Sequence, residues 1–466
     1  MEGYVPEVMA RMPLAEAVLT IWRWIADEEH LKSLFERHRG ETYERSLSFP
    51  ILVQLIADAI VKHGGSGRRS FERAKKAGVL TVSVQAAYGK LRRLPIPLSM
   101  GFLAECTDRL RDLFPEAATH PLPPSLNEFQ VVVLDGKAIK RVAKRLKPLR
   151  GVSGGVLGGR ALVAMSFNNG LALAMHAHQD GHANDVRFVL DLLPVVRQRI
   201  PGPRLWMGDR AFCNLAQVVL FSDGDDHFLV RLRKNVRFDP DTSRPAQTGR
   251  DADGRRFVET WGWLGNPDDP RRLPVRRIAL ERPEEETIVL ITDLLDGRKY
   301  PASDLLQLYR SRWGIERMFQ QVTEVFGLQA LIGGTPEATV FQFAFCLVLY
   351  NIIQVVRGHI AVAQKRPPET ISSEKLFYDA ERELSALSVL LSPAETINCL
   401  VRHHTAQEVR KHLHRLLDSL WTDLWIRSPP QRRRPAPRAS ARTHSSVYRI
   451  LKADHDQKHH PRKRAP

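Results

Sequence analysis

The first 120 residues place apolar side chains at helical intervals. Apolar positions recur every three or four residues over 14–39, 51–63 and 81–94, with a short basic segment at 70–76 between the last two. This spacing predicts amphipathic helices, and the Gly and Pro residues that follow each range are typical helix ends. We expect a helical region over 1–120. It could contact DNA, even through a helix-turn-helix, or it could be a helical bundle with a solvated basic face.

The pattern changes after the proline-rich linker at 121–124. Strand-like runs occupy 131–134, 160–167 and 171–178, and the last two are joined by Asn168-Asn169-Gly170, a strong hairpin signal. A helix over 183–199, with a break expected at Pro194, leads to a short strand at 205–207. The order predicts an α/β fold whose first part covers 127–226.

The second half continues with strands and then helices. Four strand-like segments separated by polar turns lie within 227–293, which we expect to be an inserted, mainly β subdomain. A helix over 302–326 returns to the first fold within 300–335, and further helices fill 336–426. The most apolar stretch, 338–356, approaches membrane-spanning length, but three amide side chains interrupt it, so we expect a buried central helix.

Three acidic residues stand out from this framework. Asp135 and Asp209 each end an apolar strand beside a glycine, and strand ends are where open α/β sheets hold ligands. Glu316 shares one helix face with Tyr309 and Arg312. Three carboxylates from two strand ends and a helix would bind two divalent metal ions, which clamp the attacking and leaving oxygens of a phosphodiester.

The spacing Tyr-x2-Arg-x3-Glu at 309–316, behind two strand-end aspartates, resembles the DDE transposases of bacterial insertion sequences, most closely the insertion sequence four family. The resemblance covers roughly 127–331. It implies a ribonuclease-H-like core with the β insertion between the second Asp and the Glu, flanked by helical regions. It also implies an enzyme that cuts DNA at the ends of its own element and joins the 3′ ends to a target.

The resemblance assigns roles to individual residues. Asp135, Asp209 and Glu316 would be catalytic and would hold two Mg²⁺ ions, or Mn²⁺, because carboxylate oxygens suit hard cations. The residues expected to contact DNA are Tyr309, Arg312, Trp313, Lys137 and Lys140. Core packing for the tyrosine and the tryptophan, and an ion pair between Arg312 and Glu316, are the open alternatives.

One departure from the family pattern matters. The signature continues with a Lys seven residues after the Glu, where this chain has Thr323, and the position four after the Glu is Gln320. A phosphate contact is therefore missing. The alternative function is a catalytically decayed transposase that only binds DNA; a structure-specific nuclease with the same core fits the Tyr-Arg-Glu helix less well.

Charge and composition point to the same partner. The net charge is +17 and the pI about 10, which indicates a polyanion, most simply double-stranded DNA at inverted repeats and at the target. The segment 428–466 carries eleven Lys or Arg and two Asp, with several prolines, and predicts a disordered basic tail. Four scattered Cys form no metal or disulfide pattern. We expect a cytoplasmic, nucleoid-associated protein without a membrane segment, acting as a homodimer on two DNA ends.

Overall fold

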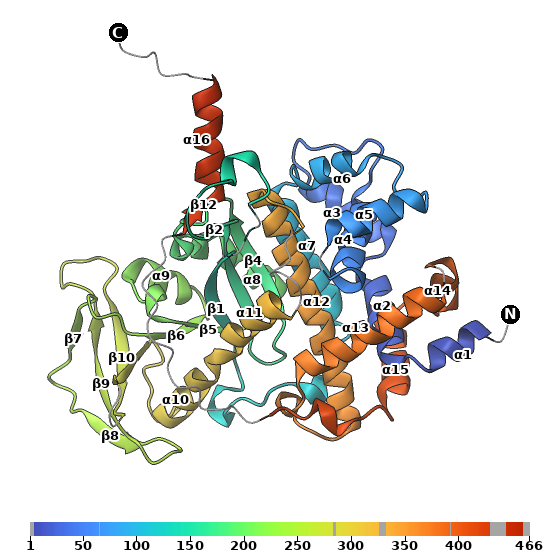
Figure 1. The fold of residues 1–466 in the computed structure, drawn as a ribbon. Coiled ribbons are helices and arrows are strands. Elements are labelled where there is room, and N and C mark those ends of the chain that lie inside the picture. The colour runs from blue at the N-terminus through green and yellow to red at the C-terminus, as the bar shows by residue number, and fades with distance from the viewer. Residues whose placement is uncertain are drawn as a thin grey trace, which may run out of the picture.

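The computed structural model describes residues 4–64, 66–140, 142, 144–282, 286–325, 332–391, 393–428 and 444–459. It is a mixed α/β protein built around one large sheet, with helices on both sides of the sheet and a mass of helices beside one edge (Figure 1). The predicted α/β class is confirmed.

The sheet has ten strands in the order β4-β3-β1-β5-β6-β11-β10-β9-β7, with β8 also paired to β9. Strand β1 runs parallel to β5, and β5 runs parallel to β6; the other neighbours are antiparallel. The bounds are β1 (Gln130–Ala138), β3 (Arg160–Ser166), β4 (Ala172–His178), β5 (Arg204–Gly208), β6 (His227–Arg231), β7 (Phe238–Pro240), β8 (Gln247–Arg250), β9 (Arg256–Leu264), β10 (Leu273–Leu280) and β11 (Ile288–Thr292).

The strands expected between 131 and 207 all form. The turn between β3 and β4 uses Gly170 at φ +70°, a conformation that favours glycine, so the hairpin signal is confirmed. Helix α8 (Val189–Arg199) follows the short 3₁₀ helix η4 (Asp185–Phe188), and α9 (Leu215–Phe221) joins β5 to β6. The break expected at Pro194 is wrong: Pro194 lies inside α8, at its sixth residue.

The segment 227–293, which we expected to be an inserted β subdomain, shares one sheet with the first part of the fold. Strand β6 pairs with β5, so the insertion begins after β6 rather than at 227. Strands β7 to β11 then extend the same sheet away from the N-terminal helices (Figure 1). The physical reason is that β11 pairs along the free edge of β6, which leaves no gap in the hydrogen bonding at which a second sheet could separate.

The N-terminal helices are α1 (Tyr4–Ala10), α2 (Pro13–Ile25), α3 (Glu28–His38), α4 (Phe49–Lys62), α5 (Gly67–Lys76), α6 (Val84–Leu91) and α7 (Ile96–Arg111). The single helix expected over 14–39 is two helices. The first ends at Ile25, and Asp27 caps the start of the second, because its side chain accepts a hydrogen bond from the backbone N–H of His30.

Helix α12 (Pro336–Ala363) is the centre of the helical mass. It is the described helix that is long and apolar enough to cross a membrane, and its most apolar window is completely buried, which confirms the expected central helix. It packs against α2, α7, α13 and α15 and against β4. Asn351 bonds both backbone groups of Ala172 in β4 at 2.9 Å, so one interrupting amide ties the helix to the edge strand of the sheet.

Aromatic contacts join the N-terminal helices to α12. Phe49 and Phe102 both lie against Phe341, with ring centres 5.7 and 5.3 Å apart, and Trp22 lies 5.5 Å from Phe345. One hydrophobic core therefore contains residues of both helical regions and of one face of the sheet. A second core fills the other face, under α8 and α9.

The helix expected over 302–326 is divided in the structure. It consists of α10 (Ala302–Arg310), a 3₁₀ turn η6 (Ser311–Trp313) and α11 (Gly314–Glu324); residues 326 and 327, its expected end, lie outside the described residues. The tighter turn is short, as 3₁₀ segments usually are, and falls between Tyr309 and Glu316.

The C-terminal region holds α13 (Ser373–Leu390), α14 (Pro393–Cys399), α15 (Ala406–Leu417), the short 3₁₀ helix η9 (Asp423–Trp425), strand β12 (Ser445–Ser446) and α16 (Val447–His459). The prediction of a wholly disordered tail is wrong for 444–459. There β12 pairs in parallel with β2 (Val156–Leu157), and Arg449 pairs with Asp180 at 2.8 Å. Residues 429–443 and 460–466 lie outside the described residues.

Candidate active site

Asp135 lies on the face of β1 that helix α11 covers. In β1, Val133, Asp135 and Lys137 share one face, because side chains alternate along a strand. The parallel pairing with β5 stops at Val133, whereas the antiparallel pairing with β3 continues through Asp135. Asp135 therefore lies beyond the pairing of β1 with β5 but within the pairing of β1 with β3.

Asp209 follows the last residue of β5, the neighbouring parallel strand. One carboxylate oxygen, Oδ1, accepts a hydrogen bond from the backbone N–H of Ala211 at 2.7 Å and so caps the turn η5 (Arg210–Phe212). Asp209 therefore has the capping role that is common for an Asp at the end of a strand. Among the described residues no backbone N–H donates to the other oxygen, Oδ2, so Asp209 is still able to act as a ligand.

The electrostatics show that the three acids share one environment. The pKa of Asp135 is raised to about 7, first by burial and then by the negative charge of Asp209; Glu316 adds a smaller effect in the same direction. The backbone N–H of Gly136 and the Arg312 guanidinium oppose this shift without cancelling it. A carboxyl group destabilised in this way binds a proton or a cation readily.

Glu316 and Arg312 face each other across one turn of helix. Arg312 Nη2 donates to Glu316 Oε1 at 2.8 Å. The guanidinium is buried, and its Nε and Nη1 have no hydrogen-bond acceptor among the described residues. Two unused donors of a planar guanidinium are suited to a pair of phosphate oxygens.

Tyr309 packs against the end of β5. It is 7% exposed, and its hydroxyl donates to the Gly208 carbonyl at 3.3 Å. Burial raises the pKa of Tyr309 to about 12, with Asp209 adding to the shift and Arg312 opposing it. In the structure this tyrosine therefore connects the helix to the strand that carries Asp209, which is the packing role that the sequence left open.

The two lysines expected to contact DNA differ in their surroundings. Lys137 is half-buried between β1 and α11, where its ammonium lies 5.3 Å from the centre of the Phe319 ring. Burial and the nearby Lys140 lower the pKa of Lys137, and Asp135 opposes this shift. Lys140 is exposed beyond the end of the strand. The side chain of Trp313 lies outside the described residues.

The sequence did not indicate that another acid, Asp185, packs against the opposite face of β1. Asp185, at the start of η4, accepts two hydrogen bonds from Arg160 at 2.6 and 3.0 Å. A Cβ on Gly136 would overlap the Asp185 carboxylate, so the glycine beside the first acid is required by close packing. The sequence signal for this close packing was the glycine directly after Asp135. Because neighbouring residues of a strand face opposite sides of the sheet, Gly136 faces Asp185 when Asp135 faces α11.

The three carboxylates are chemically suited to a divalent cation, but only two of them are positioned together. No group of three His, Cys, Asp or Glu among the described residues is close enough to hold a metal ion, and this also applies to His176, His178 and His182. Asp135 and Asp209 interact, but Glu316 is directed to Arg312. The pKa of Asp135 is raised first by burial and then by the charge of Asp209, and a bound cation would stabilise the charged form of this carboxyl group.

The match to known families covers this site. Residues 128–352, which contain β1, β5 and α11, match the family model described as the transposase DDE domain. This part of the chain is a DDE transposase domain. The resemblance to DDE transposases is confirmed, whereas membership of the insertion sequence four family stays a prediction.

Two relatives accompany the family match. The protein named "Putative transposase y4zB" from Sinorhizobium fredii is 22% identical over 149 residues, which are 32% of this chain and 41% of that protein. The chain thus spans about two fifths of the length of this curated relative. The piggyBac transposase, solved by cryo-EM as a synaptic complex with hairpin DNA, covers 88% of this chain and 87% of its own at 12% identity, with a TM-score of 0.40. A TM-score this low supports no detailed comparison.

Proposed function

We propose that the protein is a transposase that cleaves DNA at the ends of its own insertion sequence and joins the 3′ ends to target DNA. The observation that carries the proposal is the pair of Asp135 and Asp209 at neighbouring strand ends within the DDE domain, where burial first and then the charge of Asp209 raise the pKa of Asp135 to about 7. A protein that only binds DNA has no need of a destabilised acid at this position.

The fold supports the proposal by its strand order. Strands β4-β3-β1-β5-β6 form a hairpin, a central strand and two parallel strands, which is the arrangement we assign to a ribonuclease-H-like core. Strands β7 to β11 are then the insertion between Asp209 and Glu316. The helical region 1–120 is assigned to end recognition, and the protein acts as a homodimer on two DNA ends in the cytoplasm.

Each residue has a physical role in this scheme. Asp135 and Asp209 supply two of the carboxylates that would hold the cations. Arg312 uses its two free donors to hold an oxygen of the scissile phosphate, and Tyr309 fixes the helix against β5. The Nη2 group of Arg312 keeps its bond to Glu316, so one guanidinium links the third acid to the phosphate.

Two Mg²⁺ ions, or Mn²⁺ in their place, would be held by these three carboxylates. When bound, they would activate a water molecule and then a DNA 3′-hydroxyl for in-line attack on phosphorus. Lys137 lies on the same face of β1 and provides positive charge near the phosphate. Thr323 stands where the family signature has a Lys, and its hydroxyl donates to the backbone of its own helix at 2.6 Å. Lys137, on strand β1, supplies a positive charge in place of that Lys.

The test is strand cleavage on a labelled duplex that carries the terminal inverted repeat flanking the reading frame. We expect nicking at the repeat boundary with Mg²⁺ or Mn²⁺ and none with a chelator. Asp135→Ala should lose cleavage and keep binding to the repeat. Cleavage that survives in Asp135→Ala would remove the residue from the site.

A specific observation favours the alternative of a transposase that binds DNA without cutting it. Glu316 is held by Arg312, and no three acids converge at metal-binding distance within the described part of the chain. Tight binding of wild type to the repeat, with no cleavage in either metal, would support this alternative.

A further inference from the structure

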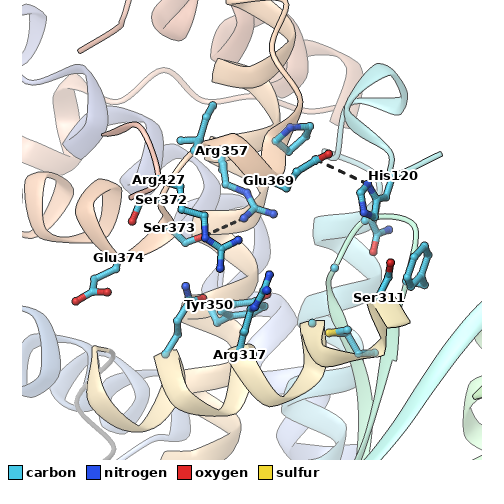
Figure 2. Close-up of a pocket in the computed structure, with 18 of the residues that line it drawn as sticks. His120, Ser311, Arg317, Tyr350, Arg357, Glu369, Ser372, Ser373, Glu374 and Arg427 are labelled. Carbon is cyan, nitrogen blue, oxygen red and sulfur yellow. Dashed lines mark hydrogen bonds and ion pairs between the residues drawn. The ribbon is translucent and has the colours of Figure 1, made fainter. Parts of the chain in front are cut away.

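A large pocket lies on the other side of α11 from the acidic cluster. It encloses about 1080 Å³ and is bordered by α11, the end of α12, the start of α13 and the segment after η9 (Figure 2). Residues spaced three and four apart along α11, including Gly314, Arg317 and Gln321, line it. Glu316 and Arg317 are adjacent in a helix, so their side chains point about 100° apart and the two sites share one wall.

Three arginines converge in this pocket from different parts of the chain. Figure 2 shows the guanidinium groups of Arg317 (α11), Arg357 (α12) and Arg427 close to one another. Within the described residues none of the three forms an ion pair with a carboxylate. Glu369, the acid near Arg357, lies 3.7 Å from His120 instead.

The arginines also repel one another. Burial and the charge of Arg317 lower the pKa of Arg427. Burial lowers the pKa of Arg357 too, with Arg427 adding to this shift and Tyr350 and Glu369 opposing it. Like charges held together without a counterion cost free energy, so such a cluster is expected where an anion compensates it.

Arg357 is the strongest sign of a built anion site. It follows an apolar run in the most buried helix of the protein. One nitrogen, Nη1, donates to the Ser373 hydroxyl at 3.0 Å, while Nε is buried and has no acceptor among the described residues. Ser373 is the first residue of α13, an 18-residue helix whose N-terminus adds further positive potential.

We infer that this pocket binds a backbone phosphate of DNA, on a strand that passes α11 beside the proposed cleavage site. The inference rests on the proposed function, since DNA is the polyanion that this domain and its net charge of +17 imply. The pocket recognises the phosphate and no base, so its contribution is independent of DNA sequence. Phosphate contacts of this kind fix the register of the strand.

The test uses the double variant Arg317→Gln/Arg427→Gln in the full-length protein. Both side chains are exposed, so the fold should persist, and Arg357 is left in place. The matched control is Arg11→Gln/Arg382→Gln, which removes the same charge from side chains that are 77% and 80% exposed outside the pocket. Binding of a short labelled duplex is measured over a range of salt concentrations, in chelator, so that cleavage is not required.

We expect the pocket variant to bind about ten-fold more weakly than the control variant. The slope of log affinity against log salt should become shallower by about one unit for one lost phosphate contact. The control variant should have nearly the wild-type slope of log affinity against log salt, because the two charges that it loses lie outside the pocket.

The outcomes separate this inference from the proposed function. If wild type binds and cuts the repeat but the pocket and control variants have equal affinities and slopes, the inference is wrong and the proposed function stands. If wild type binds no duplex, both fail. Stabilisation of wild type by inorganic phosphate, lost in the pocket variant without any change in DNA binding, would mean a free-anion site and would also overturn the inference.

Discussion

The raised pKa of Asp135 has a measurable consequence for stability. The folded value is about 7 and the ordinary value 3.8. The folded protein therefore keeps a proton that the unfolded chain has released, so stability falls as pH rises through this window and the full loss is reached above pH 7. The difference of about three pKa units corresponds to about 4 kcal/mol in all, as an upper value for a group that is partly solvated.

Asp135→Asn removes this cost because the amide is neutral at every pH. Between pH 5 and pH 8, in chelator, wild type should lose about 3 kcal/mol more than the variant, which is about 3 °C in Tm for a chain of this length. Thermal unfolding followed by fluorescence measures both proteins at each pH. Histidines that titrate in the same range are common to both and cancel in the comparison.

Asp209→Asn serves as the second variant, because Asp209 is the charge that raises the pKa of Asp135 most. It should shift the wild-type loss to lower pH without abolishing it. Mg²⁺ at pH 8 should restore stability to wild type and have no such effect on Asp135→Asn. If wild type and Asp135→Asn lose stability in parallel between pH 5 and pH 8, the reasoning about the acidic cluster is refuted.

Three further substitutions test buried contacts of the fold. Asp226→Asn should destabilise by about 3–5 kcal/mol in urea unfolding, the opposite sign to Asp135→Asn, because the Asp226 carboxylate pairs with two arginines in the core. Gly136→Ala should cost about 1–3 kcal/mol by displacing Asp185, and Gly136→Ala combined with Asp185→Ala should recover part of it. Arg276→Met should cost about 3–5 kcal/mol by leaving Glu259 buried and unpaired, and adding Glu259→Leu should restore much of the loss.

The sequence predicted the parts of the site that depend on local pattern. An apolar run that ends in an Asp beside a glycine indicated both strand ends, and the three- and four-residue spacing put Tyr309, Arg312 and Glu316 on one face of a helix. The same patterns do not specify side-chain direction. The turn η6 between Tyr309 and Glu316, and the ion pair that directs Glu316 to Arg312, come from packing between α11 and β1.

Long-range contacts account for what the sequence missed. The insertion joins the main sheet because β11 pairs with β6, which lies over 50 residues earlier in the chain. The C-terminal segment is ordered at 444–459 because β12 pairs with β2, although its composition is typical of disorder. The sequence pattern did not single out Arg357, because its surroundings are formed by α13 and the segment that carries Arg427.

The most direct test of the central claim compares cleavage and binding in Asp135→Asn, Asp209→Asn and Glu316→Gln on the same repeat duplex with Mg²⁺. These substitutions keep side-chain size and remove one negative charge each. We predict that all three bind the repeat as tightly as wild type and that none nicks it at a measurable rate. Cleavage by any one of them at a rate near that of wild type would contradict a site built from these three carboxylates.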